Sequence, residues 1–330
     1  MRAPAFWWRV RPGLAARLLQ PAGALYGAVT ARRMGRAGWR APCPVICVGN
    51  LTVGGSGKTP AALAIAERLR LMGEAPAFLS RGYGGALTGP IQVNPAQHSA
   101  DQTGDEPLLL AQAAPTIVAR ERAAGARLAH ELGASVIVMD DGLQNPGLSK
   151  DLRLAVIDAG SGFGNGLVFP AGPLRARPEG QMRHVDACVL VGAGEAALAR
   201  LAGLPALRAR LVPDPAAAGR LKGCRVLALA GIGRPEKFIS TLEEAGAIVT
   251  ERHLVGDHEP YRPAELERLG ALAEREDLLI VTTTKDRARL GERMPPLFAA
   301  RLATLPVTLR FDDPARMDHL LAQALARGRP

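Results

Sequence analysis

The chain has 330 residues, of which 48% are hydrophobic and 22% charged, and its formal net charge is +10. This length suffices for one large domain or two modest ones, and the composition excludes the collagenous, low-complexity and disordered classes. Nine basic residues precede the first acidic residue, Glu67, and a basic leader on a nearly neutral body disfavours a nucleic-acid-binding protein, which spreads its cations over one binding face.

Residues 1–40 form this leader, in which arginines alternate with aromatic residues and short apolar runs. Its longest uncharged stretch, 18–31, is about 14 residues long and contains Pro21, whereas a spanning helix needs about 20. Arginines also interrupt the apolar part, which argues against a secretory signal. We therefore predict one or two amphipathic helices that lie on anionic lipid, with Trp7 and Trp8 as candidate anchors. The alternative is that these helices simply pack on the body of the protein.

A glycine-rich loop follows the leader. The apolar run 44–49 predicts a buried strand, the periodic segment after Pro60 predicts a helix, and between them stands GGSGKT, the core of a phosphate-binding loop. In such loops backbone N–H groups face the phosphates, and here Lys58 would neutralise them and the Thr59 hydroxyl would bind Mg²⁺. The general pattern has a glycine where Thr52 stands. The predicted MgATP-binding residues are Gly54, Gly55, Ser56, Gly57, Lys58 and Thr59.

A second buried strand is predicted at 134–139, and it ends in Asp140 and Asp141. Carboxylates at the carboxyl end of a parallel strand face the crevice where such sheets bind ligands, and there they hold Mg²⁺ directly or through water. The alternative is an ordinary turn. A third strand, 154–157, leads to Asp158, which we interpret as closing the strand. These units predict an α/β fold with a P-loop NTPase-like, doubly wound and mainly parallel sheet.

The chain divides near residue 215, because 212–219 has the composition of a linker. We expect the nucleotide-binding and catalytic domain at 41–215 and a second, smaller α/β domain at 216–330. Two such domains can close on a nucleotide and its acceptor together. In the smaller domain we predict strands at 225–230, 247–250 and 278–282 and a helix at 235–245.

The cysteines indicate a reducing compartment. The chain has four, and none forms a CxxC pair: Cys43, Cys47, Cys188 and Cys224. We expect buried free thiols and a cytoplasmic protein.

Several short motifs occur along the chain in a fixed order. They are NLTVGGSGKTP at 50–60, SRGYGG at 80–85, GDEP at 104–107, DDGLQ at 140–144, PAGPLR at 170–175, AGIG at 230–233 and TKD at 284–286. Together they resemble the tetraacyldisaccharide 4'-kinase family, bacterial enzymes that phosphorylate a lipid A precursor. The resemblance implies ATP- and Mg²⁺-dependent phosphorylation of the 4'-hydroxyl of a tetraacyl disaccharide 1-phosphate. It also implies a peripheral enzyme at the cytoplasmic face of the inner membrane, and we expect no obligate protein partner.

The resemblance also implies roles for single residues. Asp105 matches the family's proposed catalytic base, His258 matches the histidine paired with it, and Lys58 matches the lysine of its phosphate loop. The predicted substrate-binding residues, which fall within motifs that line the site, are Arg81, Gln144 and Arg175. From the residues alone, Asp105 would rather cap a helix, and His258 would be an ordinary loop histidine.

Some positions depart from the family pattern. Leu143 and Asn145 stand where an aromatic residue and a histidine are common, and Thr284 stands where a glutamate is common. Ala176 occupies a position that is usually acidic, so one supporting contact is either absent or supplied by Glu179.

A different class of protein also remains open. A membrane-tethered P-loop switch ATPase or GTPase would share the loop, the acidic strand and the leader. A GTPase carries an NKxD-like base-reading motif, of which residues 284–286 are only a fragment.

Overall fold

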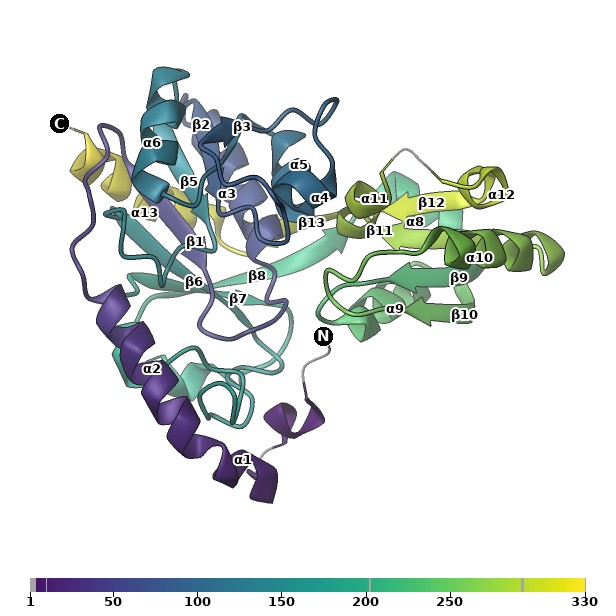
Figure 1. Cartoon of the computed structure of the whole chain (residues 1–330), viewed down its shortest axis with the longest axis horizontal. Helices are drawn as coiled ribbons and strands as arrows, with labels where there is room; N and C mark the ends of the chain where they lie inside the picture. Colours follow the sequence, from purple (N-terminus) through teal and green to yellow (C-terminus); the bar gives the residue numbers. More distant parts are fainter. Residues whose placement is uncertain (1–3, 10, 202, 292–293, 330) are drawn as a thin grey trace.

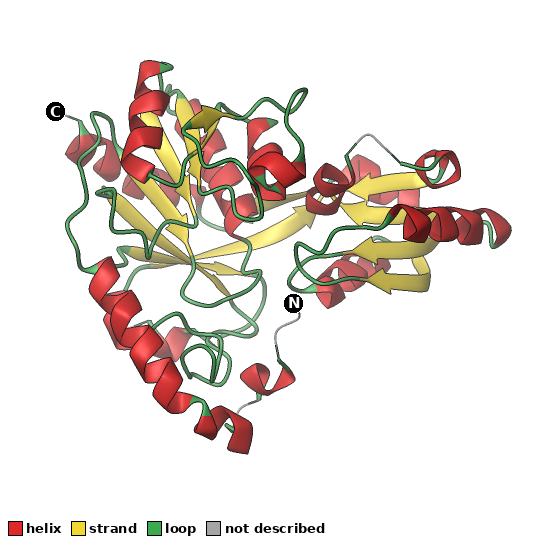
Figure 2. Ribbon diagram, in the orientation of Figure 1, coloured by secondary structure: helices red, strands yellow, loops and turns green. Residues whose placement is uncertain are grey.

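The structure has a large and a small lobe side by side (Figures 1 and 2). This computed structural model describes residues 4–9, 11–201, 203–291 and 294–329. Arg2, one of the basic residues of the leader, and position 10 lie outside the described residues.

A nine-stranded sheet forms the large lobe. Its strands in spatial order are β13 (Val307–Phe311), β8 (Ala206–Pro213), β7 (Ala187–Val191), β6 (Leu152–Asp158), β1 (Val45–Gly49), β5 (Val136–Asp140), β2 (Pro76–Ser80), β4 (Thr116–Val118) and β3 (Ile91–Gln92). Neighbouring strands run parallel except for β13–β8 and β4–β3. The predicted mainly parallel, doubly wound sheet is confirmed, and β1 and β5 lie side by side at its centre.

Helices cover both faces of this sheet, as the apolar strands require. Ile46 and Val48 of β1 point to one face, and Val45 and Cys47 point to the other. The first face carries α3 (Lys58–Leu71), α5 (Asp105–Ala111) and α13 (Pro314–Gly328). The second carries α6 (Arg122–Glu131), α7 (Pro178–Met182) and the end of α2 (Gln20–Met34). The short α4 (Ala100–Thr103) leads into α5.

The small lobe is a second parallel sheet with its own core. Its strands in spatial order are β10 (Ile248–Leu254), β9 (Arg225–Ala230), β11 (Leu279–Thr283) and β12 (Leu302–Leu305). One face packs on α8 (Pro215–Leu221) and α9 (Pro235–Glu244). The other packs on α10 (Pro263–Arg275), α11 (Thr284–Leu290) and α12 (Pro296–Ala300), with Phe298 fully buried.

The end of the chain departs from the predicted division at residue 215. Instead of completing the smaller domain, β13 pairs antiparallel with β8, and α13 buries Met317 and Leu321 on the α3 face of the large sheet. The small lobe is therefore an insertion between β8 and β13. The predicted linker 212–219 is also regular structure, because the Asp214 carboxylate accepts a hydrogen bond from the Ala217 N–H at 2.7 Å and so caps α8.

The leader forms η1 (Ala5–Trp8), α1 (Leu14–Leu18) and α2, which run along the edge of the large lobe (Figure 1). The small residues of α2, among them Gly23 and Gly27, face the body, and a side chain at Gly23 would collide with the Val168 carbonyl. Trp7 is buried, and its indole N–H donates to the Pro170 carbonyl at 3.0 Å. Trp7 therefore packs on the protein. None of the described helices is long and apolar enough to cross a bilayer.

All four cysteines are free thiols, as predicted. Cys43, Cys47 and Cys188 are buried, and Cys224 is half-buried. Burial raises the pKa of the Cys47 thiol to about 12, so this sulfur stays protonated and unreactive.

Candidate active site

The phosphate loop joins β1 to α3. Gly54 and Gly57 have φ angles of +111° and +90°, which side chains rarely adopt, so glycine is required at these turns. The loop is braced from within, because Asn50 Nδ2 donates to the Gly54 carbonyl at 3.1 Å. Gln144 Nε2 in turn donates to the Asn50 carbonyl at 2.9 Å. The hydroxyl of Ser56 is buried without a partner among the described residues, as expected of a group that awaits a ligand.

The acidic pair lies at the end of β5, next to this loop. Asp140 is 1% exposed, and neither of its carboxylate oxygens has a hydrogen-bond partner among the described residues. Burial, aided by the negative charge of Glu106, raises the pKa of Asp140 to about 8. Asp141 differs: although burial opposes ionisation, Lys58 and Arg175 hold its pKa below the usual range. Its Oδ2 lies 3.1 Å from Arg175 Nη2.

These oxygens fit a magnesium ion. The unpaired carboxylate oxygens of Asp140 and the remaining unpaired oxygen of Asp141 are hard ligands, and the buried Thr59, the second residue of α3, carries a further oxygen. No group of three or more His, Cys, Asp or Glu side chains suited to a metal occurs among the described residues. Mg²⁺ usually takes one or two carboxylates and completes its shell with water and substrate phosphates, and the acidic pair offers two carboxylates.

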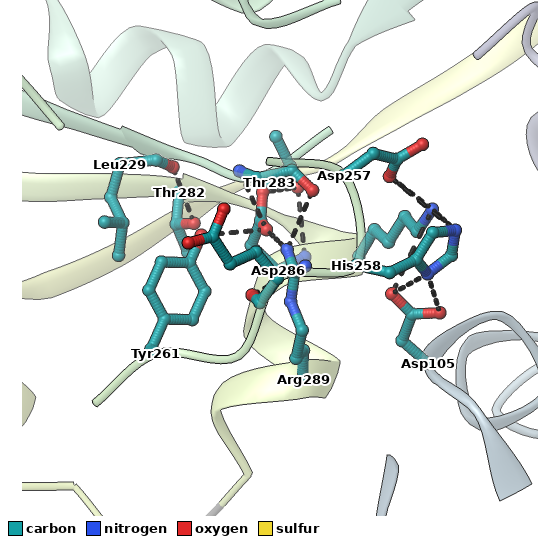
Figure 3. Close-up of polar contacts among 12 residues, drawn as sticks. Asp105, Leu229, Asp257, His258, Tyr261, Thr282, Thr283, Asp286 and Arg289 are labelled. Carbon is teal, nitrogen blue, oxygen red and sulfur yellow. Dashed lines mark hydrogen bonds and ion pairs between the residues drawn. The ribbon is translucent and has the colours of Figure 1, made fainter. Parts of the chain in front are cut away.

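Asp105 and His258 meet across the two lobes (Figure 3). Asp105 is the first residue of α5 in the large lobe, and His258 lies between β10 and α10 in the small lobe. His258 Nδ1 is 3.0 Å and 3.1 Å from the two carboxylate oxygens of Asp105. His258 has a φ of +61°, a conformation that is costly outside glycine, so its surroundings hold it there.

Asp105 stays ionised in this pair. It is 4% exposed, and burial alone would raise its pKa, but the hydrogen bond from His258 and the charge of Lys285 lower it. Its Oδ1 also accepts from the Glu106 N–H at 2.9 Å. The cap position of α5 belongs to Gly104 rather than Asp105, so the helix-capping alternative is only partly met.

Lys285 completes this cluster and was missed as a functional residue. Its Nζ lies 3.2 Å from each of three groups: Glu106 Oε1, Asp257 Oδ1 and His258 Nε2. Burial opposes its charge, but the surrounding carboxylates raise the pKa of Lys285 above its usual value. The only sequence signal was its place in the TKD motif.

Asp286, the last residue of that motif, is fully buried and holds the small lobe together (Figure 3). It accepts hydrogen bonds from the Gly231 N–H at 3.0 Å, the Tyr261 hydroxyl at 2.9 Å and the Thr283 hydroxyl at 2.7 Å. It also pairs with Arg289. With its oxygens used in this way, Asp286 is unavailable to bind a nucleotide base.

A second contact between the lobes lies over the phosphate loop. The Gly233 Cα is so close to the loop that an added Cβ would lie 2.6 Å from the Gly55 nitrogen. Beside it, Asp158 of β6 forms ion pairs with Arg234, at 3.0 Å, and with Lys237. Asp158 closes its strand as interpreted, and it also joins the lobes. The Arg234 guanidinium stacks 4.7 Å above the Trp8 ring.

The two predicted substrate-binding arginines differ in their contacts. Arg175 bridges to the acidic pair, whereas Arg81 is exposed in the loop after β2. Arg122, which we did not single out from the sequence, is buried, and burial together with the charge of Arg81 lowers its pKa to about 10. Glu179, the candidate substitute for the acidic residue that Ala176 replaces, is exposed at the start of α7. Arg175 pairs with Asp141 instead.

The departure at Leu143 has a packing reason. Its side chain is buried so close to Gly49 that a Cβ on the glycine would lie 2.6 Å from Leu143 Cγ. Leucine therefore fills the space at the end of β1.

A glycine loop between a central parallel strand and a helix, beside an unpaired acidic strand end, defines a P-loop nucleotide-binding enzyme. The chain belongs to the tetraacyldisaccharide-1-P 4'-kinase family, whose model matches residues 15–326. Tetraacyldisaccharide 4'-kinases of Methylobacterium nodulans and Bradyrhizobium diazoefficiens are 57% and 51% identical to it, covering 95% and 100% of this chain and 93% and 98% of their own lengths.

A solved structure gives the same fold. LpxK from Aquifex aeolicus, described as an "apo" form in complex with ATP, superposes with a TM-score of 0.72 at 25% identity, covering 94% of this chain and 100% of its own. These matches do not favour the alternative of a switch ATPase or GTPase, and the use of Asp286 within the small lobe argues against base reading by the TKD fragment.

Proposed function

We propose that this kinase transfers the γ-phosphoryl group of MgATP to the 4'-hydroxyl of a tetraacyl disaccharide 1-phosphate, with Asp105 as the catalytic base. The observation that supports the proposal is the contact between the buried Asp105 carboxylate of the large lobe and His258 of the small lobe, because this contact helps to keep the carboxylate ionised.

The nucleotide is held by the large lobe. Backbone N–H groups at 54–57 surround its phosphates, and Lys58 neutralises charge on the β- and γ-phosphates. Thr59 and the acidic pair, Asp140 and Asp141, hold Mg²⁺, which supplies further charge neutralisation when bound. Gln144 keeps the loop in place through the Asn50 carbonyl.

The acceptor hydroxyl attacks the γ-phosphorus with Asp105 as its base. As its oxygen bonds to the γ-phosphorus, the bond from that phosphorus to the β-phosphate oxygen breaks and ADP leaves. The hydroxyl proton passes to Asp105, whose low pKa keeps it ionised and ready to accept at neutral pH. His258 orients the carboxylate through its Nδ1. We assign Arg81 and Arg175 to the anionic groups of the substrates, since guanidinium groups pair well with phosphate.

The leader would bring the enzyme to its lipid. Leu14, Leu18 and Leu25 of α1 and α2 are 75%, 72% and 70% exposed, which is unusual for several large apolar side chains on neighbouring helices. Arginines lie exposed along the same helices. An apolar edge flanked by cations suits peripheral binding to anionic lipid, and we propose the cytoplasmic face of the bacterial inner membrane.

An assay of phosphate transfer tests this function. The wild type, Lys58→Ala and Asp105→Asn would be supplied with γ-labelled ATP and tetraacyl disaccharide 1-phosphate in mixed micelles. We expect label on the lipid, with Asp105→Asn lowering kcat by about 10²-fold or more while it retains nucleotide affinity. Lys58→Ala should lose both turnover and nucleotide affinity.

A matched control is Asp101→Asn, the same change at an exposed residue of α4, which should leave turnover unchanged. Label released only as free phosphate would contradict the kinase reaction. Full activity of Asp105→Asn would remove this residue from the role of base.

A further inference from the structure

The Asp105–His258 pair has a third member whose contribution follows from its hydrogen-bonding chemistry. An ammonium group has three donors and no acceptor. Since Lys285 Nζ lies 3.2 Å from His258 Nε2, this ring nitrogen must present its lone pair to the ammonium. The imidazole proton then lies on Nδ1, which faces the Asp105 carboxylate at 3.0 Å. The three groups therefore define one tautomer of a neutral histidine.

Without Lys285 the groups around the His258 ring would favour a different protonation state of the imidazole. Asp257 Oδ1 lies 3.7 Å from His258 Nε2, so the imidazole stands between two carboxylates, Asp105 and Asp257. Both carboxylates can accept a hydrogen bond from the ring at once only if each nitrogen carries a proton, as in an imidazolium. An imidazolium would bind the Asp105 carboxylate more strongly and make it a poorer proton acceptor. The Lys285 charge opposes this second proton.

The charged groups around the cluster are consistent with a lysine that stays protonated. Glu106 of α5 and Asp257 each lie 3.2 Å from Nζ, and Lys285 is 18% exposed. Arg289 of α11 acts on Asp105 from further away, and Lys285 itself acts on Asp140 of β5. The Tyr83 ring meets the His258 ring edge-on at 5.4 Å between centroids.

We propose that Lys285 is a positioning residue that keeps His258 neutral, with its Nδ1 proton directed at Asp105, so that the carboxylate faces a neutral imidazole instead of an imidazolium. This inference rests on the proposed function, in which Asp105 accepts the proton of the sugar hydroxyl. Because Lys285 belongs to the small lobe and Asp105 to the large one, the base is complete only with the lobes together.

The first test uses no substrate. In protein labelled with ¹⁵N-histidine, the His258 Nε2 signal at neutral pH should be that of an unprotonated ring nitrogen. In Lys285→Met, which keeps the length of the side chain and removes its charge, that signal should move to the position of a protonated nitrogen. Assignment of the signal would come from His258→Gln. An unprotonated Nε2 in both proteins, or a protonated one in the wild type, would overturn the proposal.

The second test is the pH profile of kcat. Lys285→Met should move its acidic limb upward by about 1–2 pH units, the size of effect expected of one neighbouring charge, with activity recovered at alkaline pH. Lys285→Arg, which keeps the charge, should restore the limb at least in part. The matched control is Lys237→Met, which removes another lysine of the small lobe that pairs with the large one; its limb should not move.

The outcomes separate this proposal from the function on which it rests. A uniform loss of kcat at all pH values in Lys285→Met, with native circular dichroism, would mean a merely structural lysine and would overturn the proposal. If the wild type showed the expected Nε2 state but phosphorylated no lipid, the proposed function would fail while the assignment of the tautomer would stand.

Discussion

The contact between Gly233 and the phosphate loop can be tested with one methyl group. In Gly233→Ala the new Cβ would lie 2.6 Å from the Gly55 nitrogen and 3.1 Å from its Cα, whereas ordinary contacts begin near 3.4 Å. The opposing atoms are backbone, so no side chain can rotate away. The loop and the small lobe must separate by about 0.8 Å, the difference between an ordinary contact of 3.4 Å and the 2.6 Å from the new Cβ to the Gly55 nitrogen.

A shift of this size should impair catalysis more than folding. Misplacement of reacting groups by about 1 Å costs up to about 10²-fold in rate, so we expect kcat/KM for MgATP to fall by about 10- to 100-fold. Steady-state kinetics and calorimetric titration with MgATP would measure the rate and the nucleotide affinity. Unchanged kinetics in a folded Gly233→Ala protein would refute the close packing of the two loops as a catalytic requirement.

The control is Gly219→Ala. Gly219 lies in α8, and a Cβ there would have no atom within 4 Å. Alanine favours a helix over glycine, so this variant should keep full activity and gain roughly 0.5–1 kcal/mol of stability. Loss of activity here would mean that any added methyl group disturbs the small lobe.

Two further predictions concern the bonds between and within the lobes. Asp158→Asn removes the carboxylate that pairs with Arg234 and Lys237, and we expect weaker nucleotide binding and a lower melting temperature at neutral pH. Although burial opposes it, Lys237 and Arg234 lower the pKa of Asp158 in the folded protein, so this stability is present above the unfolded pKa of about 3.9 and is lost only as pH falls through the folded value. The melting difference should therefore be constant from pH 6 to about 8; a difference that changes over that range would contradict the ion pair. Phe298→Ala should lower the free energy of unfolding by about 3–5 kcal/mol in urea denaturation, because Phe298 of α12 is fully buried in the small-lobe core with Leu266 and Leu269 of α10; a loss under about 1 kcal/mol would contradict the tight packing there.

The central part of the fold was predictable because its signals are local. An apolar run before the glycine loop, and another before Asp140, specify β1 and β5 through burial alone, and the structure places them as neighbours. The end of the chain was not predictable in this way. Nothing within 307–311 specifies that it pairs with β8 rather than with a strand of the small lobe, because the partner is chosen by packing of α13 on the large sheet.

The same distinction between local and long-range signals applies to the site. The phosphate loop and the acidic pair are each one short continuous segment that follows a strand, so the position of each could be predicted from its motif and its strand. The approach of His258 to Asp105 joins residues 153 positions apart, and only the family resemblance suggested it. Lys285 carried no signal beyond its place in the TKD motif, because a single lysine between a threonine and an aspartate is common on any helix. Its importance arises from three partners on two other segments, Glu106 of α5 and the adjacent Asp257 and His258 after β10.

The return of β13 and α13 to the large sheet has a consequence for biosynthesis. Met317, Leu321 and Ala324 form part of the same apolar layer as α3, behind the nucleotide loop. While the chain emerges from the ribosome, that layer stays open to water until the residues after 306 are made. The small lobe, whose strands and helices are contiguous, is free to form first. A stalled or shortened chain would thus display the uncovered underside of the loop helix, a surface that chaperones bind.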